Sequence, residues 1–161
     1  MEYANRKYPR LKHYDYRLPG YYYVTIHMSE NTQALSSVTQ VPEPGCAAIQ
    51  LTAVGEIAQA QLLELESRYP FVRIDKYVIM PTHIHAIIQL IAGELPRADL
   101  PAIVGAYKSL TTIAINKSLH TQGKKWFQRS FYDTVLRNET AYQECWQYID
   151  RNPAKWIETN L

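Results

Sequence analysis

Two histidines alternate along one short segment of the chain, Met80-Pro81-Thr82-His83-Ile84-His85. In a β-strand, residues i and i+2 point to the same face, so His83 and His85 would present two imidazoles side by side with Ile84 on the opposite face. Two adjacent imidazoles are a good start for a divalent metal site, although a third ligand has to come from elsewhere. A pair of ordinary polar residues on an exposed strand face explains the spacing equally well.

A tyrosine and an asparagine near the C-terminal end of the chain are one helical turn apart. Asn138 is a plausible cap for a helix whose apolar positions would form one buried stripe. The residues of that stripe are Tyr142, Cys145, Trp146 and Ile149. Tyr148 lies off the stripe, and Asn152 shares with it a face that is not the core, where a phenol and an amide oxygen could act together. We expect the helix to end at Asn152-Pro153. The alternative for this pair is a surface tyrosine and a capping asparagine before the proline.

The elements that must position these residues follow from the hydrophobic patterns. Strands are predicted at 21–26, 71–80, 83–91 and 131–136, with 29–45 as a loop or weak hairpin arm and 48–51 as a possible second arm. Helices are predicted at 54–68 with Thr52 as the N-cap, at 101–119 with Asp99 at the start, and after Asn138. We predict an α+β fold of the ferredoxin-like, split βαβ kind. Two helices would cover one face of an antiparallel sheet, and a C-terminal helix carrying Tyr148 would pack elsewhere.

Length, composition and charge narrow the classes of protein further. The 161 residues are 47% hydrophobic and 20% charged, which suits a single globular domain over 1–161 with a basic N-terminal arm at 1–20. No apolar run approaches the length of a membrane span, and no signal peptide or disulfide framework is evident, so we expect a cytoplasmic protein without membrane contact. Residues 97–137 hold seven basic and two acidic side chains. Such a block suggests a polyanionic partner, or simply an unevenly charged surface.

Several segments, in order along the chain, resemble the HUH superfamily of single-strand DNA endonucleases, named for His-hydrophobic-His. The chain is most similar to the REP-associated tyrosine transposases, within the single-tyrosine transposases. The matching segments are 18–25, Val78–His85, Tyr107-Lys108-Ser109, 126–133 with Arg137-Asn138-Glu139, and Tyr148–Trp156. Where the family has Asn directly before the first histidine of the metal motif, this chain has Thr82.

The resemblance implies a reaction and roles for particular residues. In this family a tyrosine, here Tyr148, attacks a phosphodiester of single-stranded DNA. The products are a 5′-phosphotyrosine and a free 3′-hydroxyl, and reversal rejoins the DNA without ATP. His83 and His85 match the residues that hold Mg²⁺ or Mn²⁺ against the scissile phosphate, and Asn152 matches the third ligand. The implied protein is a nucleoid-associated transposase that nicks and transfers strands at hairpin-forming repeats, as a monomer or a homodimer.

Basic residues are candidates for contacts with the DNA backbone. They are Arg6, Lys7, Arg10 and Lys12 in the N-terminal arm, and Lys108, Lys117, Lys124, Lys125 and Arg129 in the second basic block. Two alternatives remain open from the residues alone. One is a non-catalytic nucleic-acid-binding module on a ferredoxin-like fold. The other is a small metal-dependent enzyme with a different substrate.

Overall fold

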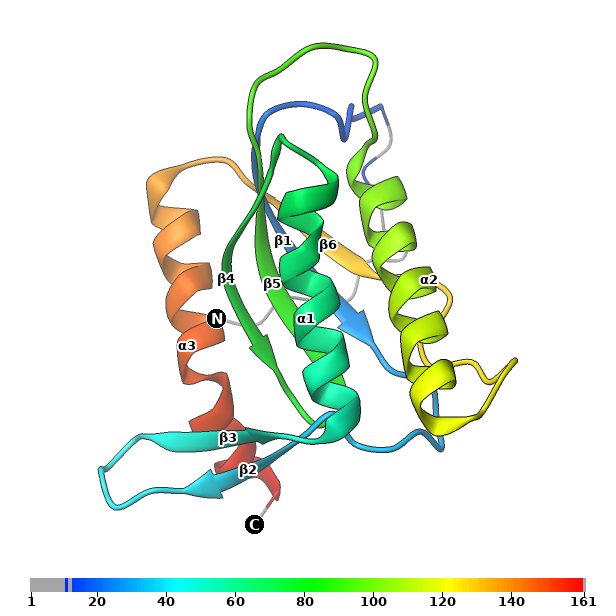
Figure 1. The fold of residues 1–161 in the computed structure, drawn as a ribbon. Helices are drawn as coiled ribbons and strands as arrows, with labels where there is room; N and C mark the ends of the chain where they lie inside the picture. Colours follow the sequence, from blue (N-terminus) through cyan, green and yellow to red (C-terminus); the bar gives the residue numbers. More distant parts are fainter. Residues whose placement is uncertain (1–10, 12, 161) are drawn as a thin grey trace.

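A four-stranded antiparallel sheet forms the centre of the computed structural model, which describes residue 11 and residues 13–160 (Figure 1). Its strands are β1 (Gly20–His27), β4 (Val72–Ile79), β5 (His83–Leu90) and β6 (Tyr132–Leu136), in the order β4-β5-β1-β6. Together with α1 (Ala53–Arg68) and α2 (Leu100–Leu119), this is the split βαβ order of a ferredoxin-like fold. The predicted α+β class is therefore confirmed.

The helices α1 and α2 cover one face of this sheet and enclose the larger core (Figure 1). Alternate residues of β1 enter that core, and Tyr22, Val24 and Ile26 are all buried there. Each helix begins at a predicted capping residue. Thr52 Oγ1 accepts a hydrogen bond from the Gly55 amide at 3.1 Å, and the Asp99 carboxylate caps the start of α2 in the same way.

The opposite face of the sheet is covered by α3 (Glu139–Asn160), which follows β6 in the chain. Tyr23 from β1 and Ile87 from β5 form a second, smaller core with Cys145 and Ile149 of this helix. The C-terminal helix was predicted to pack away from the other two, and it does. Its position decides where Tyr148 lies.

A two-stranded hairpin is inserted between β1 and α1. It consists of β2 (Ser36–Gln40) and β3 (Ala47–Leu51), where the sequence predicted a loop or a weak hairpin. Figure 1 shows the hairpin beside the C-terminal end of α3. It therefore extends the surface on which the last helix packs.

Two expectations about the last helix are wrong. The helix does not end at Asn152-Pro153 but continues to Asn160, with Pro153 inside it. A proline removes one backbone donor from a helix, yet Ile149, Asn152 and Pro153 are all buried against the rest of the protein, and this packing holds the helix continuous. Trp146 is 37% exposed rather than buried, because the face turned to the sheet is centred on positions 145, 149 and 152.

Candidate active site

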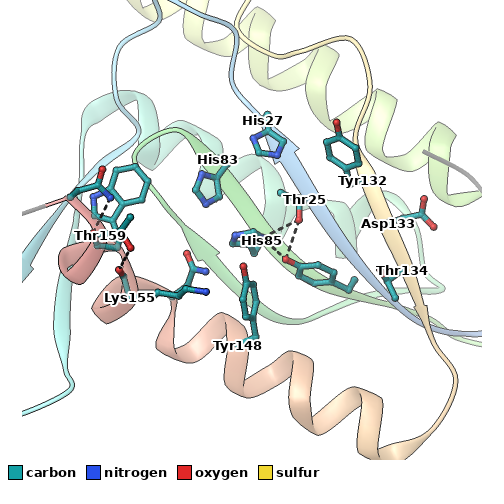
Figure 2. A pocket seen from close by; sticks show the side chains of 14 residues that line it. Thr25, His27, His83, His85, Tyr132, Asp133, Thr134, Tyr148, Lys155 and Thr159 are labelled. Atoms are coloured by element: carbon teal, nitrogen blue, oxygen red, sulfur yellow. Dashed lines mark hydrogen bonds between the residues drawn. The ribbon is translucent and has the colours of Figure 1, made fainter. Parts of the chain in front are cut away.

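The two histidines of β5 point to the face of the sheet that α3 covers (Figure 2). Their ring centroids are 4.6 Å apart, and Ile84 between them is fully buried on the other face, as the alternation predicted. In the antiparallel register with β1, His83 lies opposite His27 and His85 lies opposite Thr25. The pair is thus held by two neighbouring central strands.

Hydroxyl groups engage one nitrogen of each imidazole. The Nδ1 atom of His85 lies 2.7 Å from the Tyr23 hydroxyl and 3.0 Å from Thr25 Oγ1. The Nδ1 atom of His83 lies 3.0 Å from Thr82 Oγ1. The threonine directly before this histidine therefore forms a hydrogen bond with its ring. Such partners orient a ligating imidazole and leave its Nε2 for the metal.

Burial keeps these imidazoles neutral. It lowers the pKa of His83 to about 4, helped by the nearby His27 and opposed by a hydrogen bond with the Asn152 side chain. Burial also lowers the pKa of His85 well below its usual range, and the pKa of His27 to a smaller extent. At neutral pH each ring therefore keeps a lone pair, as a metal ligand requires.

The α3 helix brings the predicted tyrosine and asparagine to the same place. Tyr148 lies with its ring centroid 5.8 Å from that of His85, and its hydroxyl end points toward the histidines (Figure 2). Asn152 forms a side-chain hydrogen bond with His83 and is only 9% exposed. The expectation that these two residues share a face away from the core is wrong, because that face packs onto the sheet beside the second core.

Two imidazoles and one amide oxygen suit a divalent cation such as Mn²⁺ or Mg²⁺. In the described part of the chain, no group of three or more His, Cys, Asp or Glu side chains has the arrangement of a metal site. Asn152, through its contact with His83, is therefore the side chain best placed to complete the set. The residues present fit the metal, and each histidine already has its orienting partner.

The pocket in front of the histidines has a volume of about 380 Å³. Its lining includes residues that the sequence patterns did not assign to the site, among them His27, Tyr132, Lys155 and Trp156. The Trp156 ring lies 6.0 Å from that of His83, and Tyr132 packs edge-on against His27 at 5.8 Å. A signal for His27 was present, since Tyr23, Thr25 and His27 alternate along one strand. Recognising it required the register with β5.

The basic residues of the second block take different positions. The Lys108 ammonium donates to the carbonyl oxygens of Gln128 and Ser130 at 2.9 and 3.1 Å, so it braces the segment before β6. Lys124 covers the Trp126 ring at 4.3 Å. Among the five candidates of this block, the exposed ones are Lys117, Lys125 and Arg129. Lys117 lies in the last turn of α2, and Lys125 and Arg129 line a groove along α2 together with Lys108.

The remaining basic candidates belong to the N-terminal arm. Arg6, Lys7, Arg10 and Lys12 lie outside the described residues. That any of the basic side chains contacts DNA stays a prediction. Within the described residues, none of the helices is both long enough and apolar enough to cross a membrane.

Fold and site together define a ferredoxin-like α+β protein with two histidines, a tyrosine and an asparagine in one pocket. No family model matches the sequence. An uncharacterized protein of Haemophilus influenzae is 28% identical to this chain over an aligned length of 173 residues. The alignment covers 98% of this chain and 93% of the relative.

Two solved structures with a similar fold are a transposase and a candidate transposase. A REP-associated tyrosine transposase bound to a REP hairpin superposes with a TM-score of 0.64 and 21% identity, covering 96% of this chain and 74% of that one. A candidate transposase from Deinococcus radiodurans has a TM-score of 0.51 and 16% identity, covering 92% and 95%. The fold of this chain is therefore that of a REP-associated tyrosine transposase, as the sequence resemblance implied.

Proposed function

We propose that this protein is a tyrosine transposase of the REP-associated kind, which cleaves and rejoins single-stranded DNA at hairpin-forming repeats. The observation that carries the proposal is the packing of α3 against β5. Tyr148 faces His85 at 5.8 Å between ring centroids, and Asn152 bonds to His83 within the same chain. A nucleophile and three candidate metal ligands thus share one pocket, and the solved structure with a TM-score of 0.64 is a transposase bound to hairpin DNA.

In the proposed reaction the Tyr148 oxygen attacks the phosphorus of a DNA phosphodiester. A bond forms between that oxygen and phosphorus, the bond from phosphorus to the 3′-oxygen breaks, and the phenolic proton passes through water to the departing 3′-oxygen. The 5′-phosphotyrosine keeps the energy of the phosphodiester, so attack by another 3′-hydroxyl rejoins the DNA. A Mg²⁺ or Mn²⁺ ion held by His83, His85 and Asn152 would supply Lewis-acid stabilisation of the phosphate.

The residues of this chain orient the reacting groups. Thr25 and Tyr23 hold the ring of His85, and Thr82 holds that of His83, so that both imidazoles face the pocket. Asn152 is one helical turn after Tyr148, so a shift of α3 would move the nucleophile and the ligand together. This coupling suits a reaction in which the phosphate must be attacked in line.

The direct test is covalent capture of the DNA. The full chain is incubated with a single-stranded hairpin oligonucleotide and Mn²⁺, and mass spectrometry then searches for a nucleotide on Tyr148. We expect the adduct in the natural protein and its complete loss in Tyr148→Phe, with folding and DNA binding retained. An undiminished adduct in that variant would instead assign the nucleophile to Tyr132 or Tyr142.

The non-catalytic alternative finds less support in the fold. Ferredoxin-like RNA-binding modules stack bases on aromatic residues of an open sheet face. Here one face of the sheet is covered by α1 and α2, and the other packs against α3. Metal-independent binding of nucleic acid, with no cleavage by the Mn²⁺-loaded protein, would favour that alternative.

A further inference from the structure

A lysine accompanies the tyrosine on the last helix. Lys155 follows Tyr148 by seven residues, which is two helical turns, so both side chains lie on nearly the same face of α3. Helical side chains lean toward the N-terminus of their helix, and the Lys155 ammonium accordingly reaches back to 5.6 Å from the centroid of the Tyr148 ring. Both residues line the pocket that contains the two histidines (Figure 2).

The charge of this lysine is unusual for its surroundings. Among the described residues, Lys155 is the only lysine or arginine that lines the pocket, and no carboxylate there lies within ion-pair distance of its ammonium. The pocket's one acidic residue, Asp133, points away from the histidines (Figure 2). Lys155 is therefore the basic side chain that this part of the structure places at the pocket, beside the ring of Tyr148.

We propose that Lys155 is a catalytic residue that binds a non-bridging oxygen of the scissile phosphate while Tyr148 attacks. The inference rests on the proposed function and adds a residue to it. The ammonium contributes a charge-assisted hydrogen bond to that oxygen as the bond between the tyrosine oxygen and phosphorus forms. Groups positioned at developing charge contribute about 10²- to 10³-fold to rate in other enzymes, so the loss of this lysine should be large.

The chain offers a matched control for this lysine. Arg151 is one helical turn before Lys155 and lines a neighbouring hollow with it, but it does not line the pocket of the histidines. Arg151→Gln therefore removes the same charge from the same helix without removing it from the site. Lys155→Gln removes the charge from the pocket, and Lys155→Arg keeps it.

The experiment measures single-turnover adduct formation at saturating hairpin DNA with Mn²⁺. We expect Lys155→Gln to lower the rate about 100-fold, Lys155→Arg to recover most of it, and Arg151→Gln to match the natural protein. Phosphorothioate replacement of one non-bridging oxygen supplies a readout that a structural role would not move. One phosphorothioate diastereomer should slow the natural protein more than it slows Lys155→Gln. The reason is that only the natural protein has a lysine to contact the replaced oxygen.

A metal-free measurement separates this proposal from the proposed function. In a Tyr148→Phe background without metal, Lys155→Gln should reduce the slope of log affinity against log salt by about 0.7 for a single strand spanning the cleavage point. If the natural protein forms no adduct on Tyr148, the transposase assignment fails. If the adduct forms but Lys155→Gln changes neither the rate, the phosphorothioate preference nor the salt slope, the transposase assignment stands and the role of Lys155 is overturned. Circular dichroism verifies that each variant is folded.

Discussion

The buried imidazoles make the stability of this protein depend on pH in a defined direction. Burial lowers the pKa of His83 in the folded protein to about 4, whereas an unfolded chain has the ordinary value near 6.5. Between these two values the unfolded chain binds more protons than the folded protein. The free energy of unfolding should therefore be highest above pH 6.5 and fall as the pH is lowered toward 4.

The size of this effect follows from the two pKa values. Protonation of His83 only in the unfolded state costs the folded protein about 2 kcal/mol between pH 7 and pH 5, and about 3 kcal/mol by pH 4. His85 and His27 add to the loss in the same direction, because burial lowers the pKa of both. The expected loss is a large part of the 5–15 kcal/mol that is typical for domains.

Urea unfolding measures this loss directly. The chain is unfolded without metal, in the presence of a chelator, at a series of pH values from 7.5 to about 4.5, and tryptophan fluorescence reports the transition. The His83→Gln variant is the matched control, since its amide side chain does not titrate in this range. The comparison uses the change with pH in each protein, so a constant difference in stability between them does not matter.

The result would refute the argument if the two proteins lost stability in parallel as the pH fell. Parallel curves would mean that His83 titrates alike in the folded and unfolded chain, and that the pocket is wetter than its burial indicates. A second measurement follows the ring itself. Among the histidine resonances of the folded protein, one should titrate near pH 4, and that resonance should be missing from the spectrum of the His83→Gln variant.

Other predictions concern the supports of the site and of the fold. Thr25→Val removes a hydroxyl from the Nδ1 atom of His85 and should weaken Mn²⁺ binding about 10- to 100-fold in calorimetry, with the fold intact. Gly55→Ala would place a Cβ atom 1.8 Å from the Leu35 carbonyl oxygen, so the melting temperature should fall sharply; an unchanged value would show that the start of α1 can shift freely. Tyr142→Phe removes a hydroxyl that bonds to a carboxylate on β4 and should cost about 1 kcal/mol in chemical denaturation.

Local sequence patterns were sufficient for most of the strands and helices and for the shared strand face of the two histidines. The alternation around Ile84 predicted which side chains share a face of β5, because strand geometry has a strict period of two. Capping side chains marked the starts of α1 and α2 because orphan amides at a helix start need nearby acceptors. These are interactions within a few residues, which the chain encodes locally.

The end of the last helix could not be read in the same way. Pro153 favours termination on local grounds, but the structure continues the helix to Asn160 because the residues around the proline are buried. The position of Trp146 was missed for a related reason. Which stripe of a helix is buried depends on the surface it meets, and that surface is contributed by strands far away in the sequence.

The order of elements along the sequence was enough to propose a ferredoxin-like fold. Residue type and short spacing made His83, His85, Tyr148 and Asn152 candidates, and the resemblance to a transposase family gave them roles. The pairing of β1 with β5 and the packing of α3 on their shared face were needed to bring these residues together. The same packing recruited His27 and Lys155 to the pocket. Long-range register and packing depend on the free energy of burying whole surfaces, which residues far apart in the sequence contribute together. A local sequence pattern does not contain that free energy.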